Sequence, residues 1–284
     1  MTGMGSMRGR ALPDGFVPER APEVPAELRN AATVMLLRDG ATGIEVFLQR
    51  RVRGMAFAGG MTVFPGGGVD PRDRELASAE DAQVGWAGPD PAWWARRFGC
   101  SPDLARALVC AAVRETFEES GVLLAGPEPD RVVGETGRYA AARAELETRE
   151  RSLAEFLAAE GLVLRADLLR PWSNWVTPER EPRRYDTRFF LAALPEGQLA
   201  DAGTSEAAEA YWAAPQRALE DFRAGRCQLL PPTEVTLAEL AEHDTLEAAL
   251  AAERTMRPIM PKLLNRDGRW QAVLPGEPGY EEAQ

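Results

Sequence analysis

Three carboxylates lie close together in residues 114–122, which read Arg-Glu-Thr-Phe-Glu-Glu-Ser-Gly-Val. At about 100° per residue, Glu115, Glu118 and Glu119 fall within about 100° of one another on one side of a helix. Like charges at this spacing repel, and carboxylates in the last turn also oppose the negative end of the helix dipole. A divalent cation that prefers oxygen ligands, such as Mg²⁺ or Mn²⁺, would compensate these charges and bridge to substrate phosphates.

The residues around this segment predict a helix over 102–120. Ser101 is a good N-cap residue, Pro102 suits the first helical position, and Gly121 is typical of the position after a helix end. Apolar side chains at positions 109, 110, 113 and 117 lie on the opposite side, so we expect that side to pack on a core. A surface of solvated glutamates, with Arg114 paired to Glu118, would give the same spacing. The spacing alone therefore suggests a metal site without establishing one.

A glycine-rich segment precedes this helix in the chain. Residues 64–70 read Phe-Pro-Gly-Gly-Gly-Val-Asp and follow a short apolar run, so we expect a strand that ends in a turn. Glycine lets the backbone approach a ligand closely and offers carbonyl oxygen to a metal. Together with residues 114–122, the segment resembles the sequence motif of the Nudix hydrolases, the Nudix box. The box runs Gly, five residues, Glu, seven residues, then Arg-Glu-hydrophobic-x-Glu-Glu-x-Gly-hydrophobic.

The match departs from the box in three ways. Gly67 corresponds to the box glycine, but Asp73 stands where the first glutamate is expected, and Thr116 occupies a usually aliphatic position. Asp73 and Arg114 are 41 positions apart (114 − 73) where the box has eight, so about 33 residues (41 − 8) are inserted, over about 74–106. The insertion is the departure that matters most, because it separates the glycine segment from its helix.

An interrupted box resembles one branch of the Nudix hydrolases, the coenzyme A diphosphatases with an insertion in the box. Segments 172–178, 184–190 and 229–233 are similar to downstream segments of the same branch. Within the insertion, tryptophans stand at positions 86, 93 and 94. Aromatic residues at this density usually pack or contact a ligand, and we expect these to pack.

The resemblance implies an α/β (α+β) fold, an α/β/α sandwich around a mixed sheet, with the insertion and added C-terminal helices. It also implies a metal-dependent hydrolase that cleaves the diphosphate of a nucleoside diphosphate-linked substrate. Coenzyme A or acyl-CoA is the expected substrate, and 3′,5′-ADP and 4′-(acyl)phosphopantetheine are the expected products. The alternatives are another nucleoside diphosphate derivative, such as ADP-ribose, NADH or a dinucleoside polyphosphate, and a Nudix-fold sensor that binds a nucleotide without cleaving it. Because all three helix glutamates are intact, we favour the hydrolase.

The same resemblance assigns roles to box residues. The expected ligands of Mg²⁺ or Mn²⁺ are oxygen donors, namely Glu115, Glu118, Glu119 and a backbone carbonyl of Gly66 or Gly67, with Gly67 preferred. The three glutamates are also the expected catalytic residues, together with Arg114, which orients them. A carboxylate outside the box often assists in this family. The candidates are Glu206 and Glu209.

Two groups of arginines are candidates for substrate binding. Arg50 and Arg51 follow a strand-like segment, and Arg184 and Arg188 lie at and within another. The planar guanidinium group donates hydrogen bonds in pairs and suits phosphate oxygens. Ordinary surface charge is the alternative for each of them.

Residue counts exclude several other chemistries. The chain has one lysine, Lys262, and one histidine, His243. A Gly-Lys-Ser/Thr phosphate-binding loop is absent, and Ser-His or Cys-His catalysis would depend on His243, which we expect on a solvated helix surface. A net charge of −11 argues against nucleic acid as a partner. Carboxylates and arginines must therefore carry the chemistry, with a small-molecule nucleotide as substrate.

Length and composition favour one domain. A chain of 284 residues with 45% hydrophobic content can bury one substantial core. We expect a single domain over 28–276, with disordered segments at 1–27 and 277–284. No apolar stretch approaches the length of a membrane span, and the cysteine spacing fits a reducing compartment, so we expect a cytoplasmic protein with no membrane partner. A homodimer is left open.

The hydrophobic pattern predicts the remaining elements. We expect a hairpin from 31–38 and 44–50, short strands at 61–64 and 209–213, and a buried strand over 185–194. Helices are expected over 138–160, 214–225 and 235–253. Strands and helices that interleave in this way fit one sheet covered by helices.

Overall fold

The computed structural model describes residues 10–12, 17–18, 20–54, 58–74 and 85–283. The described strands are β1 (Arg10–Ala11), β2 (Leu28–Gly40), β3 (Gly43–Arg51), β4 (Thr62–Val63), β5 (Gly66–Gly68), β6 (Trp86–Ala87), β7 (Ala125–Gly126), β8 (Val163–Arg165), β9 (Leu169–Val176), β10 (Arg184–Ala193), β11 (Ala207–Ala213), β12 (Pro258–Ile259), β13 (Lys262–Arg266) and β14 (Arg269–Val273). The described α-helices are α2 (Pro91–Phe98), α3 (Pro102–Ser120), α4 (Ala140–Glu147), α5 (Leu153–Glu160), α6 (Pro215–Arg223), α7 (Pro231–Leu240) and α8 (Leu246–Ala251). Short 3-10 helices are η1 (Pro71–Arg74), η2 (Gly137–Tyr139) and η3 (Ala166–Leu168).

A mixed sheet forms the centre of the fold. Its strand order is β11-β3-β2-β10-β9-β12, with β4 paired to β3 and β5 paired to β2. Strands β2 and β10 are parallel, whereas β2 is antiparallel to β3 and to β5. The C-terminal residues of β2 pair with β3 in the predicted hairpin, and its residues 31–33 pair with the glycines of β5. The glycine segment therefore lies on the central sheet, where β3 has diverged from β2.

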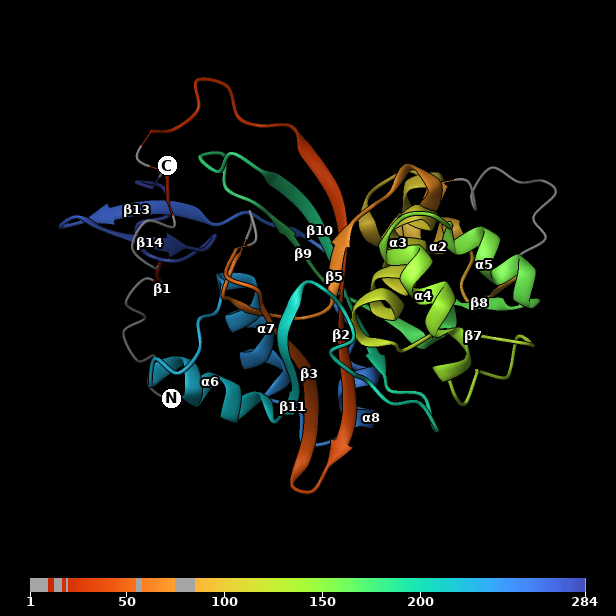
Figure 1. Ribbon diagram of the computed structural model, residues 1–284. Coiled ribbons are helices and arrows are strands. Elements are labelled where there is room, and N and C mark those ends of the chain that lie inside the picture. The colour runs from red at the N-terminus through yellow and green to blue at the C-terminus, as the bar shows by residue number, and fades with distance from the viewer. Residues whose placement is uncertain (1–9, 13–16, 19, 55–57, 75–84, 284) are drawn as a thin grey trace.

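Alternating side chains of β2 enter two different cores. Val34 and Leu36 pack with the helices on one side of the sheet, while Met35 and Leu37 pack with those on the other. This alternation is the consequence of the strand repeat of two residues. Figure 1 shows α2, α3, α4 and α5 on one side of the sheet and α6 and α7 on the opposite side. The expected α/β fold is confirmed.

The described part of the insertion is folded into the domain. After residues 75–84, which lie outside the described residues, it contains β6, α2 and the first turn of α3. Trp94 is fully buried, with its ring 5.5 Å from that of Phe98 and 5.7 Å from that of Phe190 in β10. Trp86 and Trp93 are partly buried against the same core. The tryptophans of the insertion therefore pack, as predicted.

Two helices that the pattern predicted as continuous are interrupted. The segment 138–160 contains α4 and α5, and Ser152 starts α5 with a capping box. The segment 235–253 contains α7 and α8, and the Oγ1 of Thr245 accepts a hydrogen bond from the backbone N–H of Ala248 at 3.1 Å. Because these Ser and Thr side chains bind backbone N–H groups, each begins a new helix. His243 was expected on a solvated helix surface, but it lies between α7 and α8, half-buried, with its ring 5.8 Å from that of Trp172.

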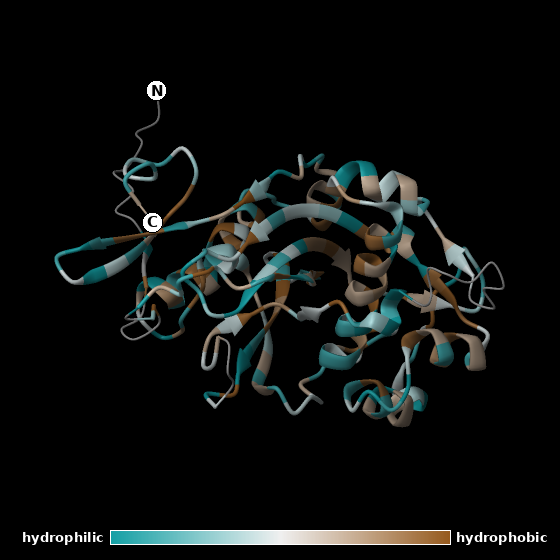
Figure 2. Cartoon of the chain, turned by 90° about the horizontal axis from the view of Figure 1, so that it is seen from above, coloured by the Kyte–Doolittle hydropathy of each residue, from teal (hydrophilic) through white to brown (hydrophobic). Residues whose placement is uncertain are grey.

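Both ends of the chain meet in a small sheet of order β1-β14-β13. Arg10 lies in the segment expected to be disordered, but it pairs with Ala272 and its guanidinium donates to Glu277 at 2.8 Å. The hydroxyl of Tyr280 donates to the carbonyl of Met260 at 3.0 Å. The described residues of the two segments expected to be disordered thus form strand pairing and side-chain hydrogen bonds. Figure 2 shows the small sheet projecting from the body of the molecule.

Within the described residues, no helix has the length and apolar character needed to cross a membrane.

Candidate active site

The three glutamates lie on α3, which begins and ends where the sequence predicted. The Oγ of Ser101 accepts a hydrogen bond from the N–H of Leu104 at 3.2 Å, and Gly121 ends the helix with φ of 73°. Only glycine adopts that left-handed conformation without strain. The acidic side of α3 is not a solvated surface, because β2, β5 and η1 pack against the helix. The glutamates are thereby enclosed between the helix and the glycine segment.

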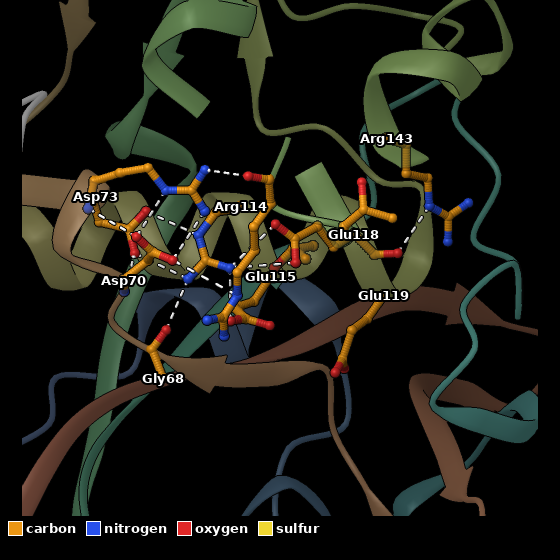
Figure 3. Close-up of polar contacts among 12 residues, drawn as sticks. Gly68, Asp70, Asp73, Arg114, Glu115, Glu118, Glu119 and Arg143 are labelled. Carbon is orange, nitrogen blue, oxygen red and sulfur yellow. Dashed lines mark hydrogen bonds and ion pairs between the residues drawn. The ribbon is translucent and has the colours of Figure 1, made fainter. Parts of the chain in front are cut away.

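Arg114 lies at the centre of a polar network (Figure 3). Its Nη1 donates to Glu115 at 2.8 Å and to Glu118 at 3.2 Å, and its Nη2 donates to the carbonyl of Gly68 at 2.8 Å. Its Nε and Nη2 also donate to the two carboxylate oxygens of Asp73, at 2.9 and 3.0 Å. Arg114 is nearly buried, so these are charge-assisted hydrogen bonds in a low dielectric. One guanidinium group thus joins α3, β5 and η1.

Asp73 is held in place by its own short helix. Its backbone N–H donates to the carbonyl of Asp70 at 3.0 Å, and its Oδ2 accepts from the N–H of Asp70 at 2.8 Å. Asp70 is in turn fixed by Arg72, whose guanidinium lowers the pKa of Asp70 to about 2. The aspartate that replaces the first glutamate of the box therefore reaches Arg114 across the whole insertion.

Glu119 and Glu115 lie against the glycine segment. Glu119 is only 5% exposed, and its side chain accepts a hydrogen bond from the N–H of Gly66 at 3.0 Å. A Cβ atom added to Gly67 would lie 2.5 Å from the carboxylate of Glu115. Any side chain at position 67 would therefore displace that glutamate, which explains why the box needs glycine there.

Two side chains donate hydrogen bonds to carbonyl groups at the C-terminal end of α3. The Nε of Arg143 donates to the carbonyl of Glu118 at 2.9 Å, and the Nε2 of Gln49 donates to the carbonyl of Glu119 at 2.8 Å. These contacts satisfy carbonyl groups that have no partner within the helix. The positive charge of Arg143 also opposes the unfavourable interaction of the glutamates with the helix dipole.

Burial dominates the electrostatics of the cluster. It raises the pKa of Glu115 to about 7, against the opposing effect of Arg114 and with a further increase from Glu118. Burial and the nearby charge of Glu115 raise the pKa of Glu119 well above its ordinary value. Burial raises the pKa of Glu118 as well, although Arg114 opposes the shift. Burial thus disfavours the ionised form of all three glutamates, and Arg114 offsets only part of this effect at Glu115 and Glu118.

A cavity of about 370 Å³ opens beside these carboxylates. Glu115, Glu119 and the three glycines of β5 line one part of it, together with Arg51. The cavity is also lined by residues from β9, β10 and the loop between them, and by residues in or next to the terminal sheet. These include Trp175, Glu181, Tyr185, Leu12 and Leu263. An acidic cluster therefore lies in the wall of a cavity that also has a largely apolar region, as ligand sites commonly do.

Comparisons with known proteins identify the family of the chain. Residues 99–240 match the family model described as the NUDT19 Nudix domain, and these 142 residues are half of the 284. An acyl-coenzyme A diphosphatase NUDT19 of Gallus gallus is 31% identical over 278 residues, covering 84% of this chain and 72% of that protein. The chain belongs to the Nudix hydrolase family. The family predicted from the split box is thereby confirmed.

Two further relatives cover most of this Nudix hydrolase. Acyl-coenzyme A diphosphatase NUDT19 of Homo sapiens is 28% identical, covering 85% of this chain and 74% of that protein. A crystal structure of a Nudix hydrolase from Alicyclobacillus acidocaldarius is 30% identical, with a TM-score of 0.63, covering 81% of this chain and 98% of that chain. The family-model match begins at residue 99, so the glycine segment lies outside it.

The donor set of this Nudix hydrolase fits a divalent cation by its chemistry. Glu115 and Glu119 supply carboxylate oxygens at the cavity wall, and burial raises the pKa of both, so a cation that stabilises their ionised form suits this place. Within the described residues, no group of three or more Asp, Glu, His or Cys side chains is already arranged to hold a metal. Arg114 donates to both Glu115 and Glu118, but Glu118 does not line the cavity. Glu115 and Glu119, beside the backbone of Gly67, are therefore the residues that would hold the ion.

The structure separates the four arginines predicted to bind substrate. Arg51 lines the cavity, whereas its neighbour Arg50 is half exposed and pairs with Glu209 at 2.8 Å. Adjacent residues of β3 point to opposite sides, which explains the difference. Arg184 and Arg188 do not line the cavity: Arg184 donates to the carbonyls of Thr177 and Ala26, and Arg188 is paired to Asp186. For Arg50, Arg184 and Arg188 the structure thus favours structural or surface roles.

Of the two candidate carboxylates outside the box, only one lines the cavity. Glu206 lines the cavity and pairs with Arg51 at 2.7 Å, whereas Glu209 does not line it.

Arg149, which the sequence did not single out, lines the cavity too, with its side chain 78% exposed and its Nε 3.8 Å from Asp70. Its backbone carbonyl accepts a hydrogen bond from Arg72. Arg149 stands in a polar stretch after α4 without any pattern, so only its place in the fold reveals it.

Proposed function

We propose that this protein hydrolyses the diphosphate of coenzyme A or acyl-CoA, with Mg²⁺ or Mn²⁺, to 3′,5′-ADP and 4′-(acyl)phosphopantetheine. The observation that carries the proposal is the placement of Glu115 and Glu119 beside the glycine segment in the wall of the cavity. The choice of substrate is supported by the relatives from Gallus gallus and Homo sapiens, both named acyl-coenzyme A diphosphatases.

The chain's own residues supply orientation and positive charge. A divalent cation held by Glu115 and Glu119 would neutralise the diphosphate and lower the pKa of the water that attacks phosphorus. Arg114 fixes the rotamers of Glu115 and Glu118, and so holds the acidic cluster in one arrangement. Arg51 and Arg149 are the basic side chains of the cavity wall, and we assign to them the binding of phosphate oxygens.

Glu206 has a separate role in this proposal. It pairs with Arg51, and it is the candidate carboxylate outside the box that reaches the cavity. By holding the guanidinium of Arg51, Glu206 sets the direction in which Arg51 can donate to a phosphate. We therefore assign Glu206 the orientation of Arg51.

The net charge restricts the kind of partner. We propose a small-molecule nucleotide substrate and no nucleic-acid partner, because the net charge of −11 disfavours binding to a phosphate backbone. A cytoplasmic location stays a prediction, and a homodimer is left open.

One experiment tests the proposal. Purified protein is incubated with Mg²⁺ or Mn²⁺ and each of coenzyme A, an acyl-CoA, NADH, ADP-ribose, a diadenosine polyphosphate and a nucleoside triphosphate, and the products are identified by mass. We expect 3′,5′-ADP from coenzyme A and acyl-CoA. Cleavage of the other compounds without coenzyme A would contradict the substrate, and tight binding without cleavage of any compound would favour a nucleotide sensor.

A further inference from the structure

Glu181 is a buried carboxylate in the cavity wall. The proposed hydrolysis at Glu115 and Glu119 does not assign it a role. It lies in the loop between β9 and β10 and is 8% exposed. Its Oε1 is buried and accepts no hydrogen bond from any residue that the structure describes. A buried carboxylate oxygen without a partner is costly, and burial raises the pKa of Glu181 to about 6. Such a group in a cavity points to contact with a ligand.

The loop that carries Glu181 is held at both ends. The N–H of Thr177 donates to the carbonyl of Tyr185 at 2.9 Å, and the N–H of Tyr185 donates to the Oγ1 of Thr177 at 3.0 Å. The guanidinium of Arg184 donates to the carbonyl of Thr177 at 3.2 Å, and the N–H of Glu181 donates to the carbonyl of Pro178 at 3.2 Å. The backbone of Glu181 is therefore fixed before any ligand binds.

Strand pairing places this loop away from the carboxylate cluster. Phe189 of β10 pairs with Thr33 of β2, which pairs with Gly66, the residue that donates to Glu119. Tyr185, the second residue of β10 after the loop, lies four residues earlier in the strand. At about 3.3 Å per residue, the two levels are roughly 13 Å apart along the strand. A group that contacts Glu181 is therefore several bonds removed from a diphosphate held at the glutamates.

The surroundings of Glu181 restrict the chemistry of that group. The neighbouring cation, Arg180, lies 4.8 Å from the ring centre of Trp270 and donates to the carbonyl of Pro18. Trp175 and Leu263, which also line the cavity, add apolar surface to its wall. A carboxylate repels phosphate and, when ionised, can only accept hydrogen bonds. Its partner should be a neutral donor on an otherwise apolar part of the ligand.

We propose that Glu181 is a specificity-determining residue that accepts a hydrogen bond from a neutral N–H group of the substrate, at the part of the cavity remote from the diphosphate. This inference rests on the proposed function, because it takes the substrate to be a nucleoside diphosphate derivative. Coenzyme A offers such groups on both sides of its diphosphate, namely the amino group of adenine and the amides of pantetheine.

The test measures binding of the two halves of coenzyme A by calorimetry. 3′,5′-ADP carries the adenine amino group and 4′-phosphopantetheine carries the amides, so the two titrations separate the sources of the N–H group. Each is titrated into wild type, Glu181→Leu, Glu181→Gln and Glu179→Leu. Glu179 is an exposed carboxylate of the same loop that does not line the cavity, so it is the matched control.

We expect Glu181→Leu to weaken binding of one half about 10-fold or more, with little effect on the other half. Glu181→Gln keeps an acceptor oxygen and should recover part of this loss, whereas Glu179→Leu should bind as wild type does. The inference is overturned if Glu181→Leu binds both halves as tightly as wild type, or if neither half binds wild type. Cleavage of coenzyme A is scored separately: a wild type that cleaves it while Glu181 proves irrelevant keeps the proposed function and loses this inference. Binding that depends on Glu181 without any cleavage does the reverse.

Discussion

Arg114 and Asp73 form a two-point ion pair, at 2.9 and 3.0 Å, although 41 positions separate them in the chain. Both residues are buried, so the pair fastens the glycine segment and η1 to α3 on either side of the insertion. An insertion in the box is tolerated because this contact does not depend on the residues between. The pair therefore does for the split box what direct continuity of the chain does for an uninterrupted one.

Replacing Asp73 should test this fastening. Asp73→Asn removes one of the three carboxylates that pair with the buried Arg114, which we expect to lower the free energy of unfolding by about 3 kcal/mol. Urea denaturation of the metal-free protein measures it. Arg74→Gln, at the exposed neighbouring position, is the control and should lie within about 0.5 kcal/mol of wild type. Equal stability of Asp73→Asn and wild type would show that the pair does not hold the box together.

Glu119 should matter for activity and not for folding. Glu119→Gln keeps an oxygen that can accept the hydrogen bond from Gly66 and removes a buried charge whose pKa is raised. We expect kcat to fall about 100-fold or more, since a ligand of the cation is lost, while thermal stability at pH 8 is no lower than that of wild type. Glu209→Gln, which lies outside the cavity, is the control for both measurements. A fully active Glu119→Gln would remove Glu119 from the metal site.

The adjacent arginines of β3 should differ in function. Arg51 is 17% exposed in its side chain and lines the cavity, whereas Arg50 is 50% exposed and does not. We expect Arg51→Ala to raise KM for coenzyme A about 10-fold or more, because it loses a charge-assisted contact to phosphate. Arg50→Ala should change KM less than about 2-fold, since an exposed ion pair contributes little. Steady-state kinetics of the two variants decide the matter, and similar KM values for both would contradict the assignment.

Glu181 should make stability depend on pH. Its pKa is raised from 4.5 to about 6 by burial, so the folded state binds a proton more tightly than the unfolded state does. The free energy of unfolding therefore falls as pH rises from about 4.5 to about 6, by about 2 kcal/mol from this group. Glu181→Gln removes the titration and should be the more stable protein at pH 8, but not at pH 4. Urea denaturation at both values checks this, and an equal difference at the two pH values would show that Glu181 does not cause it.

Much of the fold was predictable because its signals are local. The caps of α3 at Ser101 and Gly121, the hairpin of β2 and β3, and the buried strand β10 all follow from the spacing of apolar residues and from turn residues. The predictions failed where a polar side chain starts a new helix within a periodic stretch, as Thr245 does for α8. They also did not include the pairing of Arg10 with Ala272, which joins residues over a separation that no local pattern reports.

The sequence by itself determined that Glu115, Glu118 and Glu119 share one side of a helix, because the helical repeat fixes that geometry within two turns. It also determined, through the split box, the family of the chain. Only the tertiary structure decided that Arg51 rather than Arg50 meets the cavity, that Asp73 reaches Arg114, and that Arg149 and Glu181 belong to the same cavity wall. These relationships depend on how strands and loops pack across the sheet, and contacts between residues far apart in the chain leave no trace in the spacing of neighbouring residues.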